Sequence, residues 1–265
     1  MKFRLNNRSL IKVSGKDSES FLQSQFSNDI TKIQQGAVQI NTYCQHQGKI
    51  IAIIWVFKNN NAFYLSIHSS VSSIVLDKLN MYKMMSDVSF EDKSQEINQY
   101  GMVEEKIDIN GFKINNKIHL KTTRDILEYE ENNYYWNKCL IDSYIPEVTI
   151  DTSELFVPEV LNLDIDQLGV SFNKGCYPGQ EVVARMHYLG NAKRRMYRFK
   201  SNIHVNPGSG LFVSSSKSMR PSGVVVSSVY LDGESYFLGT LESTHQKEQI
   251  SLNSENDSKV TLLDV

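Results

Sequence analysis

The chain has 265 residues, of which 40% are hydrophobic and 22% charged, and its net charge is −2. These values are typical of a soluble globular protein that is long enough for more than one domain, and they give no overall bias towards nucleic acid or membranes. The longest aliphatic run, residues 50–57, is far shorter than the roughly 20 residues that a membrane-spanning helix needs, and residues 1–10 hold no apolar core of a signal peptide, so we expect a cytoplasmic protein.

The first third of the chain mixes helical and strand patterns. Asp17 is placed to cap a helix, because apolar residues follow it at helical spacing, and Ser70 is placed in the same way before a second helix. Apolar runs predict strands at residues 10–13, 38–44, 50–57 and 62–67. Since helices and strands do not alternate regularly, we expect an α+β protein with antiparallel or mixed sheets. The buried face of the second helix is expected to hold Val71, Ile74, Val75, Leu79 and Tyr82.

A β-hairpin is predicted at residues 106–114. Two short runs of alternating apolar residues flank Asn110 and Gly111. An Asn-Gly pair supplies the two positive-φ residues of a type I′ turn, which is the usual tight connection between two antiparallel strands.

The last third of the chain shows short strand patterns at regular spacing. They lie at residues 196–200, 210–214, 223–229 and 235–240, and glycine and proline separate them. This spacing predicts a small all-β barrel. We therefore divide the chain into an α+β region, residues 1–195, and a C-terminal β-barrel domain, residues 196–265.

The charge distribution is uneven, because residues 182–231 contain no aspartate or glutamate. A one-sided basic segment usually faces an anion, but a solvated strand face explains it equally well, and both interpretations stay open here. The basic residues of this segment are Arg185, Lys193, Arg194, Arg195, Arg198, Lys200, Lys217 and Arg220.

The three cysteines, Cys44, Cys139 and Cys176, include no Cys-x-x-Cys pair. An odd and sparse set argues against a disulfide framework. It also argues against a self-contained zinc or iron–sulfur site, since such a site needs about four ligands.

The most informative stretch runs from Lys174 to Arg185. Two glycines and a proline make a tight turn there. If a helix follows, Cys176 lies near the positive end of its dipole and close to Lys174, which favours the thiolate form. Glu181 is placed to accept paired hydrogen bonds from the N–H and amino groups of a heterocycle. Two other interpretations remain open: a structural turn around a buried free cysteine, and a Cys176–His187 nucleophile pair that the spacing alone does not establish.

The octapeptide from Lys174 to Glu181 resembles the Lys-Gly-Cys-Tyr-x-Gly-Gln-Glu signature of the YgfZ family. These are folate-binding proteins linked to tRNA modification, related to a mitochondrial iron–sulfur assembly factor and, more distantly, to the glycine-cleavage T-protein. Weaker blocks follow the family's order at residues 21–30, 43–50, 145–146, 156–159, 162–163 and 188–195. Ser24 departs from the pattern, because glycine is usual at this position.

The resemblance implies a cloverleaf in which two α/β lobes and a terminal β-barrel surround a central hole that holds a tetrahydrofolate. Trp136 matches a family position where an aromatic ring contacts folate. Arg8 stands at a second such position and would replace a stacking ring by a guanidinium. For Trp136 the alternative is a place in the core beside Tyr134 and Tyr135.

The same resemblance gives roles to residues of the octapeptide and of the segment after it. Glu181 would contact the pterin ring. Tyr177 and Arg185 complete the expected folate-binding set. Cys176 would be a functional thiol, and its chemical role is left open.

The resemblance finally implies an accessory function rather than a metabolic reaction. The T-protein looks to need an acidic residue in the stretch that matches residues 48–53, where this chain has Ala52 and Ile53. Methyl groups cannot replace a carboxylate in proton transfer or charge stabilisation, so folate-dependent aminomethyl transfer is the disfavoured alternative. We expect a monomeric folate-binding protein that supports the assembly or repair of iron–sulfur enzymes, including tRNA-modifying ones. Direct contact with tRNA stays open.

Overall fold

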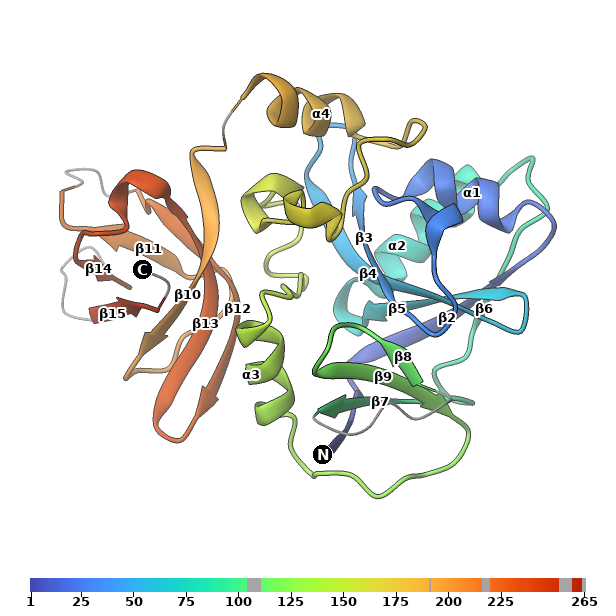
Figure 1. Cartoon of the computed structure of the whole chain (residues 1–265), viewed down its shortest axis with the longest axis horizontal. Helices are drawn as coiled ribbons and strands as arrows, with labels where there is room; N and C mark the ends of the chain where they lie inside the picture. Colours follow the sequence, from blue (N-terminus) through green and yellow to red (C-terminus); the bar gives the residue numbers. More distant parts are fainter. Residues whose placement is uncertain (104–110, 191, 216–219, 253–258, 264–265) are drawn as a thin grey trace.

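The computed structural model describes residues 1–103, 111–190, 192–215, 220–252 and 259–263. Two open antiparallel sheets and a closed β-barrel make up the molecule (Figure 1). The barrel lies on one side, the two open sheets lie on the other, and helix α3 with the irregular segment of residues 143–173 runs between them. This arrangement confirms the expected α+β class and the small C-terminal barrel.

The larger open sheet has the strand order β3-β4-β5-β2-β6. Its core is formed by alternating apolar residues of the strands together with apolar residues of α1 and α2, as the period-2 and helical patterns predict. Its elements are β2 (Arg8–Ser14), α1 (Ser18–Gln25), β3 (Gln39–Cys44), β4 (Ile50–Asn59), β5 (Ala62–His68), α2 (Ser69–Tyr82) and β6 (Ser89–Asp92).

Three details around these helices differ from the expectations. Asp17 stands at the N-cap of α1, but its side chain makes no cap hydrogen bond there and accepts one from the backbone N–H of Asp87. The cap of α2 is His68, whose Nδ1 accepts from the backbone N–H of Ser70. Tyr82 is 46% exposed rather than buried, because α2 ends there, beyond the buried face at Leu79.

The smaller open sheet has the order β1-β7-β9-β8. Helix α3 (Tyr134–Asp142), which the sequence analysis did not predict, packs between this sheet and the barrel. Gly101 makes the close contact possible, because a Cβ at this position would lie 2.5 Å from the Trp136 ring. The predicted hairpin falls largely outside the described residues; its second strand appears as β8. The strands are β1 (Lys2–Arg4), β7 (Asn98–Val103), β8 (Gly111–Lys113) and β9 (Ile118–Thr123).

The closed barrel has the order β10-β13-β12-β11-β14-β15. The four predicted strands are present, and β14 and β15 add two that are too short to show a pattern. The boundary after residue 195 stays a prediction, although the first barrel strand begins at Arg194. The strands are β10 (Arg194–Ser201), β11 (Gly210–Val213), β12 (Gly223–Leu231), β13 (Glu234–Glu242), β14 (Ile250–Ser251) and β15 (Lys259–Leu262).

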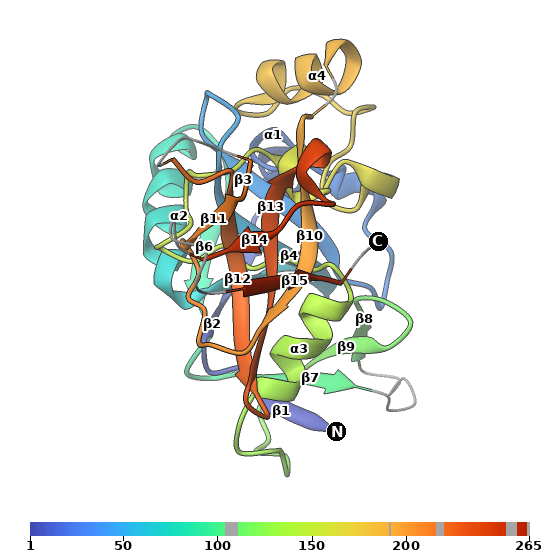
Figure 2. The ribbon, with the colours of Figure 1, turned by 90° about the vertical axis from the view of Figure 1, so that its left-hand side faces the viewer.

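The remaining elements are short. Helix α4 (Gln180–Leu189) follows the octapeptide turn and lies at one end of the molecule in both views (Figures 1 and 2). Within the described residues, no helix has the length and apolar character that crossing a membrane requires. The 3-10 helices are η1 (Ile30–Lys32), η2 (Pro158–Leu161), η3 (Ile165–Gln167) and η4 (Ser243–His245).

Candidate functional site

The octapeptide turn is held against the β3–β4 connection by two glycines. Gly179 has φ +82° and Gly48 has φ +79°, a conformation that disfavours L side chains. A Cβ on Gly179 would lie 2.4 Å from the backbone oxygen of Gln45 and 2.7 Å from Cα of Gly48. The two turns therefore touch backbone to backbone, and glycine is required at the contact.

Lys174 ties the same turn to the end of α1. Its Nζ donates hydrogen bonds to the backbone oxygens of Gln23 at 2.6 Å, Asn28 at 3.0 Å and Phe26. Burial lowers the pKa of Lys174 to about 8. The ammonium group of Lys174 is thus engaged by three carbonyls and anchors the turn.

Tyr177 is the inward-facing residue of the turn and is 6% exposed. Its hydroxyl has no hydrogen-bond partner among the described residues, and it lies in the neighbourhood of Cys44 and Glu159. Burial raises the pKa of Tyr177. Most of the Tyr177 side chain, expected in the folate-binding set, is therefore packed against the protein interior.

Glu159, which the sequence analysis did not single out, is fully buried beside Tyr177. Neither carboxylate oxygen has a partner beyond its own residue in the described part of the chain. Burial raises the pKa of Glu159 to about 7, and it raises the pKa of the Cys44 thiol to about 12. Arg195 offsets this effect only in part, since its Nη1 donates to the backbone oxygen of Glu159 and to Asp164, each at 2.7 Å.

Cys176 is exposed and faces an open hollow of about 550 Å³, called here the thiol hollow. Glu181 and His46 also line it, and His46 Nε2 lies 3.5 Å from the hydroxyl of Tyr82. Arg185 is exposed and does not line this hollow. The full lining is His46, Cys176, Tyr177, Pro178, Gly179, Gln180, Glu181 and Ala184.

A second hollow, of about 110 Å³, lies where the larger sheet, α3 and the barrel meet, and is called here the junction pocket. Arg8 and Trp136 both line it. Trp136 is 2% exposed and packs edge-on against Trp55, with ring centroids 6.3 Å apart. Its lining is Asn7, Arg8, His68, Trp136, Asn137, Leu140, Ile141, Ile145, Glu147, Thr149, Pro207, Ser227 and Ser228.

Arg8 is rigidly held at the wall of the junction pocket. Its guanidinium lies 3.8 Å from the centre of the Trp55 ring. Nη1 donates to Glu147 Oε1 at 2.5 Å, while Nε and Nη2 donate to the side chain and backbone oxygens of Ser66 at 2.8 and 2.7 Å. A planar cation stacked on an indole and fixed by three hydrogen bonds presents a preorganised polar edge.

Two polar groups of the junction pocket lack partners. Thr149 Oγ1 and Ser227 Oγ are buried atoms and make no hydrogen bond to any described residue. Buried hydroxyls without partners are uncommon, because each one loses its hydrogen bonds to water. They suit a ligand that carries donors and acceptors on its edge.

The six residues singled out from the sequence therefore do not form one site. Arg8 and Trp136 share the junction pocket, Cys176, Tyr177 and Glu181 share the thiol hollow, and Arg185 lines neither. Figures 1 and 2 show α4 and α3 well separated along the vertical direction in both views. That Glu181 and Trp136 contact one folate stays a prediction, although the two side chains line separate hollows.

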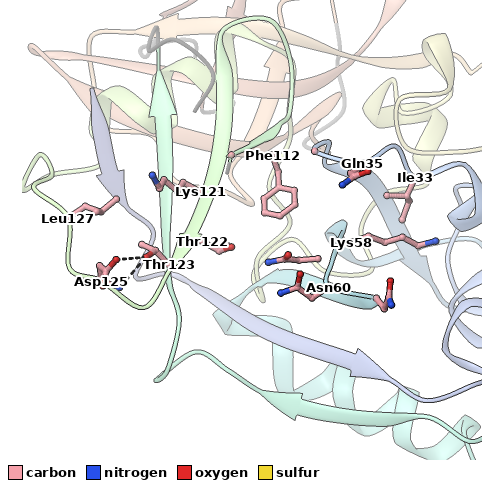
Figure 3. A pocket seen from close by; sticks show the side chains of 14 residues that line it. Ile33, Gln35, Lys58, Asn60, Phe112, Lys121, Thr122, Thr123, Asp125 and Leu127 are labelled. Atoms are coloured by element: carbon pink, nitrogen blue, oxygen red, sulfur yellow. Dashed lines mark hydrogen bonds between the residues drawn. The ribbon is translucent and has the colours of Figure 1, made fainter. Parts of the chain in front are cut away.

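A further hollow, of about 830 Å³, involves none of these residues (Figure 3). The β4–β5 turn at Asn60 faces strand β9 at Thr122 across it, and Phe112 lies between them. No group of three His, Cys, Asp or Glu side chains within the described ranges is arranged to hold a metal ion.

Comparisons with known proteins give both a lineage and a fold. No protein-family profile matches the chain. An uncharacterized protein of Haemophilus influenzae is 32% identical over 262 residues, covering 95% of this chain and 93% of that protein. The tRNA-modifying protein YgfZ of Aliivibrio fischeri strain MJ11 is 28% identical over 294 residues, covering 98% of this chain and 92% of that protein. The structure of the glycine cleavage system aminomethyltransferase T from Bartonella henselae superposes with a TM-score of 0.65 at 12% identity. The superposition covers 98% of this chain and 84% of that one.

Proposed function

The chain belongs to the YgfZ family, and on that premise we propose that it binds a tetrahydrofolate in the junction pocket and acts as an accessory protein for iron–sulfur enzymes, including those that modify tRNA. The observation that carries the folate proposal is the chemistry of this pocket. It combines a buried indole, a fixed guanidinium–carboxylate pair and two hydroxyls without a partner in the described ranges, where the larger sheet, α3 and the barrel meet.

The size of the junction pocket indicates which part of the ligand it holds. A water molecule needs roughly 10–15 Å³ of such cavity volume, so about 110 Å³ accommodates on the order of eight waters. This is comparable to one bicyclic ring and too small for a whole folate. The pterin therefore enters the pocket, and the aminobenzoyl-glutamate part lies outside it.

The polar edge of the pterin matches the groups present. Its amino and ring N–H groups donate to the carboxylate of Glu147, which lines the pocket beside Arg8. The Thr149 and Ser227 hydroxyls serve its remaining acceptors and donors. Trp136 supplies an apolar wall for the ring.

The accessory role is proposed for the thiol hollow. Cys176 is presented at the surface by a turn that Lys174, Tyr177 and Gly179 hold in place. An exposed thiol on a fixed turn is accessible to a partner protein, whereas a catalytic thiol in a closed site is not. Aminomethyl transfer is not favoured, because Ala52 and Ile53 are buried inside β4 and bring no carboxylate to a hollow.

Tryptophan fluorescence tests where the folate binds, since the chain has only two tryptophans. Trp136 lines the junction pocket, and Trp55 lies beneath Arg8 at its wall. Saturating tetrahydrofolate is expected to quench most of the emission, after correction with N-acetyltryptophanamide for absorbed light. Saturable binding that leaves the emission unchanged would place the ligand elsewhere and overturn the assignment.

A further inference from the structure

Helix α4 and the segment before it carry an aromatic cluster at the protein surface. The rings of Phe172 and His187 are stacked, with centroids 3.7 Å apart and an angle of 13° between their planes. Tyr188 meets both rings edge-on, at 6.0 and 5.0 Å, and is 65% exposed. His187 and Tyr188 are exposed and Phe172 is half-buried, so the cluster offers ring surface to a partner.

The cluster borders a hollow of about 480 Å³, called here the α4 hollow. Its rim is polar. The side-chain amides of Gln167 and Asn173 make no hydrogen bond to the part of the chain that the structure describes, and Asp166 is exposed. Asp164 is already engaged, because Arg195 donates to it at 2.7 Å. The hollow thus offers ring faces together with free amide and carboxylate groups.

Cations lie on both sides of the cluster along the chain. Arg185 precedes Tyr188 by one helical turn, so the two side chains share a face of α4. Lys193 follows the helix, and both it and Arg185 are exposed and form no ion pair with a described residue. Arg194 is 46% exposed at its side chain and makes a loose pair of 3.6 Å with Glu242.

We propose that the α4 hollow is a contact site for single-stranded RNA. An unpaired base stacks on the exposed ring of Tyr188 and meets the His187 ring edge-on, since these two rings are 80° apart. Asn173, Gln167 and Asp166 hydrogen-bond its edge. The phosphates that flank this base form ion pairs with Arg185 and with Lys193. Stacking platforms flanked by cations recognise single strands, because only an unpaired base exposes its ring face and its pairing edge together.

The site differs from the junction pocket in every residue and does not depend on folate binding. RNA, rather than DNA, is expected to bind because of the role beside tRNA-modifying enzymes, and at this one point the inference rests on the proposed function. The acceptor groups of the rim favour bases that carry an amino group. A purine-rich strand is therefore expected to bind better than a uridine-rich one.

Fluorescence anisotropy of a labelled, unstructured purine-rich RNA of about 12 nucleotides tests the proposal, since stacking of one base contributes a measurable share of affinity. Wild-type protein is expected to bind this strand more tightly than its duplex, and less tightly as salt rises. Tyr188→Ala and His187→Ala are expected to weaken binding at least about fivefold, and Tyr188→Phe to retain it. Arg185→Ala is expected to reduce the slope of the logarithm of the binding constant against the logarithm of the salt concentration by about 0.7, because one phosphate contact is lost.

The matched control is Tyr230→Ala, since Tyr230 is a 42% exposed barrel residue that does not line the α4 hollow. Its ring also lies beside a histidine, with its centroid 5.6 Å from that of His204. Tyr230→Ala is expected to bind RNA as the wild type does, and so is the pocket-filling variant Ser227→Leu. The proposal is overturned if wild-type protein does not bind the strand, or if Tyr188→Ala binds as Tyr230→Ala does. Equal affinity for a free mononucleotide, or tighter binding of the matching DNA, would also overturn it.

Discussion

Arg8 and Glu147, which are 139 positions apart in the sequence, form an ion pair of 2.5 Å at the wall of the junction pocket. Their side chains are only 2% and 16% exposed. The pair joins strand β2 to the segment after α3, so it fixes both the fold and the polar edge of the pocket.

Removing the carboxylate of this pair is expected to destabilise the protein strongly. Glu147→Ala leaves the Arg8 charge buried without its counter-ion, which costs about 3 kcal/mol in the free energy of unfolding. Urea denaturation measures the change. Glu91, an exposed carboxylate that pairs with Lys12 and Lys93, is the control, because solvent screens such pairs and Glu91→Ala should cost far less. Similar losses in the two variants would show that burial of the Arg8 pair contributes nothing.

The backbone contact at Gly179 predicts that a side chain at this position destabilises the protein, and Gly233 serves as the control. Gly179→Ala combines a positive φ with a Cβ placed 2.4 Å from a backbone oxygen, so we expect a loss of more than about 2 kcal/mol. Gly233 has nearly the same φ, +84°, but no atom of a described residue other than its chain neighbours lies within 4 Å of the position that a Cβ would take there, so Gly233→Ala should cost only about 1 kcal/mol. Thermal unfolding of both variants gives the difference, and equal losses would contradict the contact.

Glu159 predicts a pH dependence of stability. Burial raises its pKa from 4.5 to about 7, so between these values the folded protein holds a proton that the unfolded chain has released. The contribution of Glu159 to stability is therefore present below pH 4.5 and is lost as pH rises towards 7. Relative to wild type, Glu159→Gln should gain about 2 kcal/mol between pH 5 and pH 8. Urea denaturation of both proteins at pH 5 and pH 8 measures this gain. The same difference in the free energy of unfolding at both pH values would rule it out.

Cys176 predicts a separation of folding from function. Because its side chain is exposed, Cys176→Ala should change the free energy of unfolding by no more than about 0.5 kcal/mol. The same variant should fail to restore iron–sulfur enzyme activity in cells that lack the protein. Cys139→Ala, at a half-buried position, serves as the control and should restore it. Full rescue by Cys176→Ala would remove the proposed role of this thiol.

The sequence predicted those parts of the fold that rest on local periodicity. Four strands of the larger sheet, β2 to β5, follow from apolar runs, whereas β6 was not predicted. Four strands of the barrel follow from short apolar patterns with glycine and proline between them. Helix α3 was missed because its short, aromatic-rich sequence shows no clear cap and its length is settled by packing against Gly101 and the barrel.

The site was predictable only in part, for a physical reason. Arg8 and Trp136 were found through the family resemblance, and the structure brings them to one pocket. Glu147, Thr149 and Ser227 complete that pocket, but they are ordinary polar residues from distant segments, and only tertiary packing shows that two of their hydroxyls lack partners among the described residues. Sequence order likewise could not show that Glu181 lines a different hollow from Trp136.

Calorimetric titration of tetrahydrofolate, with oxygen excluded, into wild-type protein and the variants Ser227→Leu and Glu181→Ala tests the central claim most directly. Ser227→Leu fills the junction pocket and should weaken binding at least about tenfold, whereas Glu181→Ala should bind as the wild type does. Loss of binding in Glu181→Ala with unchanged binding in Ser227→Leu would contradict the account and move the folate to the thiol hollow.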